Sequence, residues 1–191
     1  MTIARMTPER ETASPRAKRS RRLPRTTRQR AIRPTLETIE SRLLLTTYFV
    51  GNVGNSGEGT LRQAILDSNA NTTQVNVIDF AITLGSPSIA PTTPLPTITQ
   101  SVVIDGTSQS GYVGTPIVEL VGSANVPIGL NFTAGGSTIK GLVLNRFSDA
   151  AIVLGGTAGG STVAGDYIGT NVAGTATLSN WDGRPRDLSE Q

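Results

Sequence analysis

Ser137-Thr138-Ile139-Lys140-Gly141-Leu142-Val143-Leu144-Asn145 and Ser161-Thr162-Val163-Ala164-Gly165-Asp166-Tyr167-Ile168-Gly169 follow one pattern, 24 residues apart. Upstream, Gly129-Leu130 aligns with Val153-Leu154 at the same offset. A looser copy, Ser101-Val102-Val103-Ile104-Asp105-Gly106, places a small residue, β-branched residues and a glycine in the same order. The sequence therefore contains an internal repeat.

The repeats consist of short β-branched runs separated by turn residues. The predicted strands cover residues 75–80, 97–98, 102–104, 117–120, 128–132, 138–144, 152–154 and 162–168. A period of about 20 to 45 residues, with each unit too thin to bury its own apolar side chains, is typical of a solenoid. We therefore expect an all-β fold, a right-handed parallel β-helix of about 24-residue coils, with Gly141 and Gly165 at equivalent corners. A β-sandwich is the alternative.

A single helix is expected at about residues 60–69, before the repeats. Thr60-Leu61-Arg62-Gln63 has the form of a capping box, in which Thr60 accepts from the Gln63 amide and the Gln63 side chain reaches back. With a strand at Tyr48-Phe49-Val50, this helix would cover the open end of the coils. We thus assign residues 48–100 to an N-terminal cap and first coils, and residues 101–180 to the β-helix.

Composition separates a leader from this body. Residues 1–34 hold 11 Lys or Arg against two Glu, a formal charge of +9, so the chain's +3 leaves −6 for residues 35–191. Such a basic, apolar-poor segment is predicted to be disordered. Because residues 35–191 are acidic, we do not expect the folded part of the chain to bind nucleic acid specifically. A nucleic-acid-binding arm in the basic leader is an alternative hypothesis. Residues 181–191 form a polar tail without periodicity.

Absent residue types exclude several functional classes. The chain has no cysteine and no histidine, which excludes disulfides, thiolate or histidine metal sites and catalytic triads. No apolar run approaches the roughly 20 residues of a transmembrane helix. We therefore predict no transmembrane segment.

Several motifs resemble those of a known family. Asn55-Ser56-Gly57-Glu58-Gly59-Thr60-Leu61-Arg62-Gln63-Ala64-Ile65 resembles the "DSGxGSLRQAI" or CSLREA-like opening of large bacterial secreted and surface β-helix proteins. The resemblance continues through Val103-Ile104-Asp105-Gly106-Thr107 and Asp166-Tyr167-Ile168-Gly169-Thr170. It implies that further coils follow in relatives, so this chain would be a truncated member.

The segment before the body carries a second resemblance. In residues 35–47, Leu36, Ile39, Leu43 and Leu44 lie at helical spacing, which predicts a short amphipathic helix. Leu36-Glu37-Thr38-Ile39-Glu40-Ser41-Arg42-Leu43-Leu44-Leu45 is similar to the "LExLExRxLL" element of planctomycete extracellular proteins. That similarity implies export to the cell surface or the medium, although no standard signal peptide precedes it.

The acidic side chains offer a weak case for catalysis. The β-helix is also the fold of pectate lyases, so we considered Asp105, Glu119, Asp149 and Asp166 as carboxylates of a polysaccharide hydrolase. Lys140 and Arg146 are the possible bases of a lyase. Because these residues are isolated in sequence and Asp beside Gly is common in turns, no catalytic, cofactor or metal residue is assigned.

Two asparagines have a structural and a functional interpretation. Asn131 and Asn145 could form a stacked amide ladder at a coil corner, which we favour, or contact a glycan. We expect a non-enzymatic secreted or envelope protein that serves adhesion or carbohydrate contact, with glycans or envelope components as partners and an undetermined oligomeric state. A polysaccharide lyase or hydrolase, or its inactive relic, is the alternative.

Overall fold

The computed structural model describes residues 45–180, all within the compact unit Ser41–Gln191. The leader at residues 1–34, the predicted helix up to residue 44 and the tail at residues 181–191 lie outside the described residues. The described elements are β1 (Leu45–Val50), α1 (Leu61–Ala70), β2 (Val75–Phe80), β3 (Ser88–Ile89), β4 (Val102–Asp105), the 3₁₀ helix η1 (Gly106–Ser108), β5 (Val118–Val121), β6 (Ile128–Phe132), β7 (Thr138–Lys140), β8 (Leu142–Asn145), β9 (Ala150–Leu154), β10 (Thr162–Ala164) and β11 (Tyr167–Ile168).

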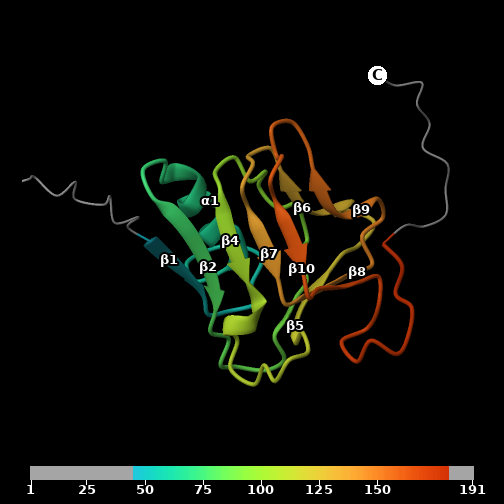
Figure 1. Cartoon of the computed structure of the whole chain (residues 1–191). Helices are drawn as coiled ribbons and strands as arrows, with labels where there is room; N and C mark the ends of the chain where they lie inside the picture. Colours follow the sequence, from blue (N-terminus) through green and yellow to red (C-terminus); the bar gives the residue numbers. More distant parts are fainter. Residues whose placement is uncertain (1–44, 181–191) are drawn as a thin grey trace, which may run out of the picture. The chain divides into compact units, whose positions relative to one another are not determined.

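The strands form three parallel sheets. Sheet A has the order β1-β2-β4-β7-β10, sheet B the order β11-β8-β5-β3, and sheet C contains β6 and β9. From β4 onward the chain visits sheets A, B and C in turn and then returns to A (Figure 1). The prediction of a strand-rich fold with parallel pairing between repeats is confirmed.

The 24-residue offset is the register of the last two passes. Thr162 pairs with Thr138 in sheet A and Ile168 with Leu144 in sheet B. The looser copy also aligns as predicted, since Ile104 pairs with Ile139. In sheet C the prediction was wrong: Leu130 pairs with Ile152, an offset of 22, because the turn before β9 is two residues shorter than the sequence alignment assumed.

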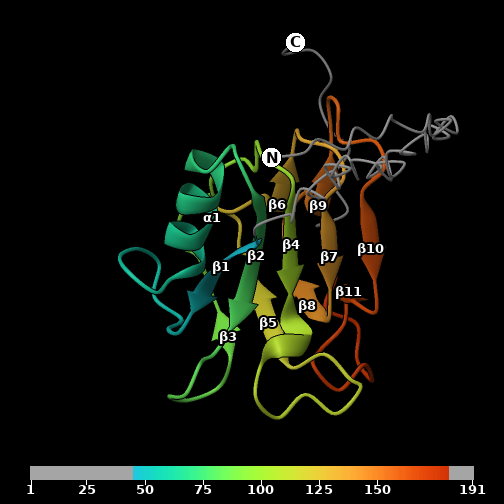
Figure 2. The same ribbon diagram turned by 60° about the vertical axis from the view of Figure 1, so that its left-hand side comes forward.

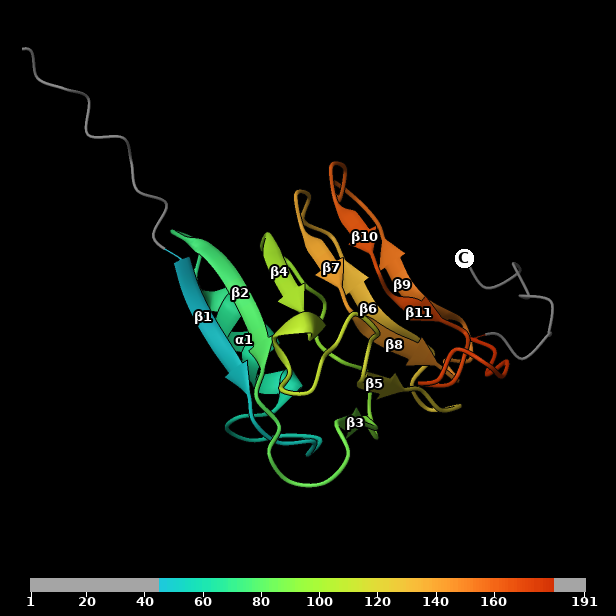
Figure 3. The same ribbon diagram turned by 60° about the horizontal axis from the view of Figure 1, so that its bottom comes forward.

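Inward side chains of successive strands stack on one another. In sheet A the stack runs through Tyr48, Ile78, Ile104, Ile139 and Val163. Its three middle members are fully buried. Figure 3 shows the strands following one another from β1 to β10. Burial of such aliphatic stacks stabilises the fold by roughly 25 cal/mol per Å² of apolar surface.

Helix α1 lies beside β1 and β2, at the N-terminal side of the sheets (Figure 2). It begins after Thr60, whose Oγ1 accepts from the Gln63 amide at 3.3 Å, and it buries Leu61 and Ile65. The other half of the predicted capping box is wrong, because the Thr60 amide donates to the Gly57 carbonyl at 3.3 Å, while Gln63 Nε2 donates to Asp67 Oδ1 at 2.8 Å. An i, i+4 partner on the helix replaces the reach back to the cap.

Glycines divide two predicted strands. The runs at residues 138–144 and 162–168 are each cut into a strand of sheet A and one of sheet B, at Gly141 (φ 71°) and Gly165 (φ 68°). Both glycines occupy the left-handed region, as equivalent tight corners require. Strand β1 begins at Leu45, earlier than predicted, while β3 and η1 were not predicted.

Candidate functional site

One row of charged side chains crosses the exposed face of sheet A. The register places Phe49, Asp79, Asp105, Lys140 and Ala164 side by side on consecutive strands. Neighbouring strands lie about 4.8 Å apart, so the two aspartates and the lysine are direct neighbours. We call Asp79, Asp105 and Lys140 the charged row.

The two carboxyls of the charged row have different environments. Lys140 Nζ lies 2.7 Å from Asp105 Oδ2, and Asp105 Oδ1 accepts from the Thr107 amide at 2.9 Å. Burial would raise the pKa of Asp105, but these hydrogen bonds outweigh it and hold the pKa below 3.8. Burial and the neighbouring Asp105 raise the pKa of Asp79 above 3.8, although Lys140 opposes this.

The acids considered from the sequence do not gather at one place. Glu119 is held in sheet B, where Oε2 accepts from Ser88 Oγ at 2.9 Å. Asp149 precedes β9, and its amide donates to the Pro127 carbonyl at 2.9 Å. Asp166 lies at the corner before β11, accepts from the Leu142 amide at 2.7 Å, and has its pKa raised by burial. Only Asp105 belongs to the charged row.

The two asparagines do not form a ladder. Asn145 is fully buried in sheet B, where Nδ2 donates to Glu119 Oε1 at 2.8 Å and to the Thr170 carbonyl at 2.9 Å. Asn131 lies in sheet C, where Nδ2 donates to Thr97 Oγ1 at 3.3 Å. The prediction of a ladder between them was wrong because they occupy different sheets, although the burial of Asn145 fits its structural interpretation.

A groove of about 580 Å³ lies where the loops after β2 and η1 meet. Nine residues form its walls: Ile82, Thr83, Gly85, Ser86, Pro87, Gln109, Ser110, Ile117 and Val172. Gln109 is buried and clamps the first loop, accepting from the Ile82 amide and donating to the Ile82 carbonyl, both at 2.9 Å. All nine lining residues are uncharged, and they combine hydroxyl and amide groups with aliphatic side chains.

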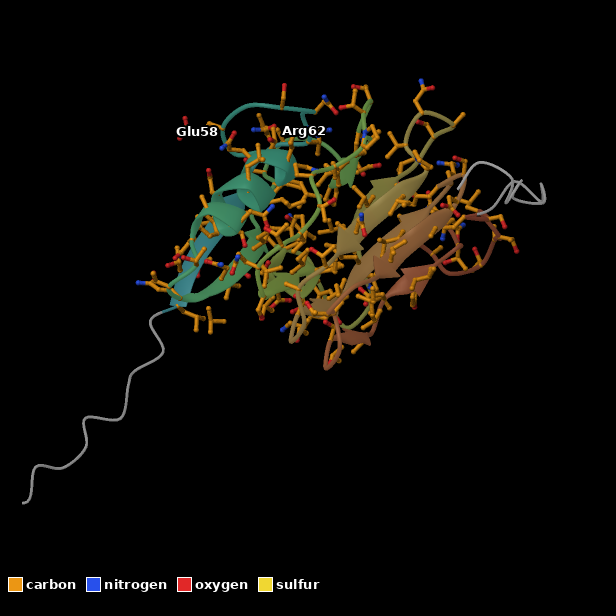
Figure 4. All side chains as sticks on the ribbon, turned by 90° about the horizontal axis from the view of Figure 1, so that it is seen from above. Glu58 and Arg62 are labelled. Carbon is orange, nitrogen blue, oxygen red and sulfur yellow. The ribbon has the colours of Figure 1, made fainter. Side chains whose placement is uncertain are left out.

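A smaller hollow of about 270 Å³ lies between β1, α1 and the loop that joins them. Glu58 and Asp67 line it together with Phe49, whose side chain is 63% exposed. Figure 4 shows Glu58 and Arg62 at this end of the fold. Arg62 donates to Asn55 O at 2.8 Å and to Pro94 O at 2.7 Å, which assigns it to loop anchoring.

Sequence reasoning missed Asp79 and the groove. Asp79 is the last residue but one of β2 and Asp105 is the last residue of β4, and this similar place near the end of a strand is the signal that could have paired the two acids. The groove depends on loops with no repeated pattern. Within residues 45–180, no cluster of three or more Asp or Glu could hold a metal ion, and no helix is long and apolar enough to span a membrane.

Comparison with known proteins gives no family assignment. No protein-family model matches the sequence, and searches of curated proteins and of solved structures find no match.

Proposed function

We propose that this chain is a non-enzymatic module of a secreted or cell-envelope protein, folded as a right-handed parallel β-helix, and that it contacts neutral carbohydrate. The solenoid interpretation is supported by the order of passes through sheets A, B and C and by the in-register aliphatic stack. Parallel crossovers are right-handed in almost all known cases, which supports the handedness. Export rests on the resemblance of residues 35–45 to planctomycete leaders.

The groove at Gln109 is the observation that carries the carbohydrate part of the proposal. Hydroxyl groups of Thr83, Ser86 and Ser110 lie beside the aliphatic surfaces of Ile82 and Ile117. A neutral sugar presents hydroxyl groups and C–H faces that such a lining complements, whereas a charged ligand would find no counter-ion there. The clamp between Gln109 and Ile82 keeps the wall in place without ligand.

Calorimetric titration with neutral and acidic oligosaccharides tests this function. Ser110→Trp fills the groove and should abolish binding, whereas Ser56→Trp, a matched change at an exposed position outside the groove, should leave it intact. The proposal fails if no neutral oligosaccharide binds the unchanged chain, or if Ser110→Trp binds as tightly. A reporter fused behind residues 1–47 tests export separately.

The charged row favours a second candidate, a polysaccharide hydrolase. Asp79 and Asp105 are adjacent carboxyls with pKa values shifted in opposite directions, a pattern found in acid and base pairs. Their strands lie about 4.8 Å apart, a backbone spacing that would allow the carboxyl separation of about 5 to 5.5 Å used by retaining glycosidases. Asp79→Asn and Asp105→Asn should each abolish release of reducing sugar, while Ser110→Trp should not. A chain that releases none from any polysaccharide tested excludes this candidate.

A further inference from the structure

The groove at Gln109 takes its walls from three separate parts of the chain. One part follows β2, a second follows η1, and Val172 follows β11. The segment that carries Val172 is a tight turn, because Asn171 Oδ1 accepts from the amides of Thr175 at 2.9 Å and Ala176 at 3.2 Å. These bonds hold Val172 in place beside loops that come much earlier in the chain.

Few polar side chains of the lining remain available to a ligand. The Gln109 amide is engaged at both ends, since Oε1 accepts from the Ile82 amide and Nε2 donates to the Ile82 carbonyl. The backbone is engaged as well, because the Pro87 carbonyl accepts from the Glu119 amide at 2.9 Å. The side-chain polar groups of the lining that bond to no other described residue are three hydroxyls, those of Thr83, Ser86 and Ser110.

Branched aliphatic side chains form the apolar part of the lining. Ile82, Ile117 and Val172 contribute methyl groups, and none of the nine lining residues is aromatic. An aromatic ring offers a flat surface on which a sugar ring can lie, whereas branched side chains meet at small pits that fit a methyl group. A sugar hydroxyl placed in such a pit would lose its hydrogen bonds to water without replacement.

We propose that the preferred ligand of the groove is a neutral sugar in which a methyl group replaces a hydroxymethyl group, as in a 6-deoxyhexose residue. This inference rests on the proposed carbohydrate function and names the class of sugar. The methyl group packs against Ile117 and Val172, while ring hydroxyls bond to Thr83, Ser86 and Ser110.

The open position of Val172 limits the expected preference. Hydrophobic sites discriminate by roughly 10 to 200-fold between ligands that differ by one small group. Val172 is 37% exposed, so the groove encloses its ligand only in part. We therefore expect the lower end of the range, a preference of about tenfold for the methyl-bearing sugar.

Nuclear magnetic resonance titration of the full-length chain with two matched pairs of methyl glycosides tests the inference. L-rhamnoside is compared with L-mannoside, and L-fucoside with L-galactoside, so that the members of each pair differ only at the sixth carbon. In a pair that binds, the 6-deoxy member should have a dissociation constant about tenfold lower than that of its hydroxylated partner.

A pair of identical substitutions tests the role of Val172. Val172→Thr replaces one methyl group of the groove by a hydroxyl at nearly the same size, and it should reduce the preference by about fourfold. Val113→Thr is the matched control, at a residue that is 87% exposed on the loop after η1 and outside the lining, and it should keep the preference unchanged. A thermal melt of each variant verifies that it folds.

The outcomes separate this inference from the proposed function. Equal or tighter binding of the hydroxylated sugars, or a preference that Val172→Thr leaves unchanged, overturns the inference and leaves the carbohydrate function standing. So does the absence of binding by all four glycosides in a chain that binds another neutral oligosaccharide in calorimetry. A chain that binds no neutral sugar of any kind refutes both.

Discussion

Lys140 Nζ lies 2.7 Å from Asp105 Oδ2, and this ion pair joins two neighbouring strands that are 35 residues apart in the chain. The same register puts Asp79 on the other side of Asp105, one strand further from the cation. Lys140 therefore neutralises the nearer carboxylate, while Asp79 retains an unfavourable like-charge neighbour. Substitution of the two acids by Asn should consequently change the free energy of unfolding in opposite directions.

Asp105→Asn should lower the free energy of unfolding at neutral pH by roughly 0.5 to 1 kcal/mol, a modest value because the Lys140 side chain is 39% exposed. The folded-state pKa of Asp105 lies below 3.8, so its stabilisation is complete above pH 3.8 and is lost as the pH falls through the lower folded-state value. Urea unfolding of both proteins at neutral and at acid pH measures this. If the two proteins differ as much in free energy of unfolding at acid pH as at neutral pH, the ionised Asp105 carboxylate is not the source of the stabilisation.

Asp79→Asn should instead stabilise the fold at neutral pH, by roughly 0.5 kcal/mol, because it removes the like charge beside Asp105. The folded-state pKa of Asp79 is raised, so the ionised group destabilises the fold at high pH, and protonation relieves this as the pH falls toward 3.8. The gain should shrink in acid. It should also shrink in the Asp105→Asn background, and equal gains in both backgrounds would contradict the coupling.

The parallel pairing could be predicted because the apolar pattern of the sequence repeats in the segments that form successive strands of sheets A and B. Ile139 and Val163 occupy equivalent positions in the sequence and pair in the structure. The offset in sheet C could not be predicted, since turns tolerate insertions and the pattern around Leu130 is too short to fix a register. Strand β3 has only two residues, Ser88 and Ile89, which is too short for a periodic signal.

Little of the candidate site could be predicted from the sequence. Asp79 and Asp105 become neighbours only through the pairing of β2 with β4, which is looser in sequence than the later repeats. The groove depends on Gln109, a residue that is usually exposed, being buried against the backbone of Ile82. Propensity and periodicity carry no information on such a contact.

Arg62→Lys should destabilise the chain by about 2 kcal/mol, because a single ammonium group cannot replace a guanidinium that serves two loops. Arg62 donates to Asn55 O and Pro94 O, and Nη2 donates to Thr93 O at 2.8 Å. Chemical denaturation measures the loss, and hydrogen exchange should show faster opening of residues 91–97. Arg146→Lys, at an exposed position, is the control. Equal stability of the two variants contradicts the anchoring role.

Gly106→Ala should cost about 3 kcal/mol, because successive passes of the chain touch through their backbones at this corner. A Cβ atom on Gly106 would lie 2.2 Å from the carbonyl oxygen of Gly141, and backbone cannot rotate away as a side chain can. Gly159→Ala is the matched control, since no atom lies within 4 Å of the added carbon.

Neither Gly106 nor Gly159 has a positive φ, so the comparison isolates the steric clash from conformational strain. We expect Gly159→Ala to be neutral or to stabilise slightly, by up to about 1 kcal/mol, because alanine restricts the unfolded chain. Thermal unfolding of the two variants and of the unchanged chain measures this, and Gly106→Ala should have the lowest melting temperature of the three. Similar melting temperatures for both would mean that the corner is loosely packed and that adjacent passes are not in backbone contact at Gly141.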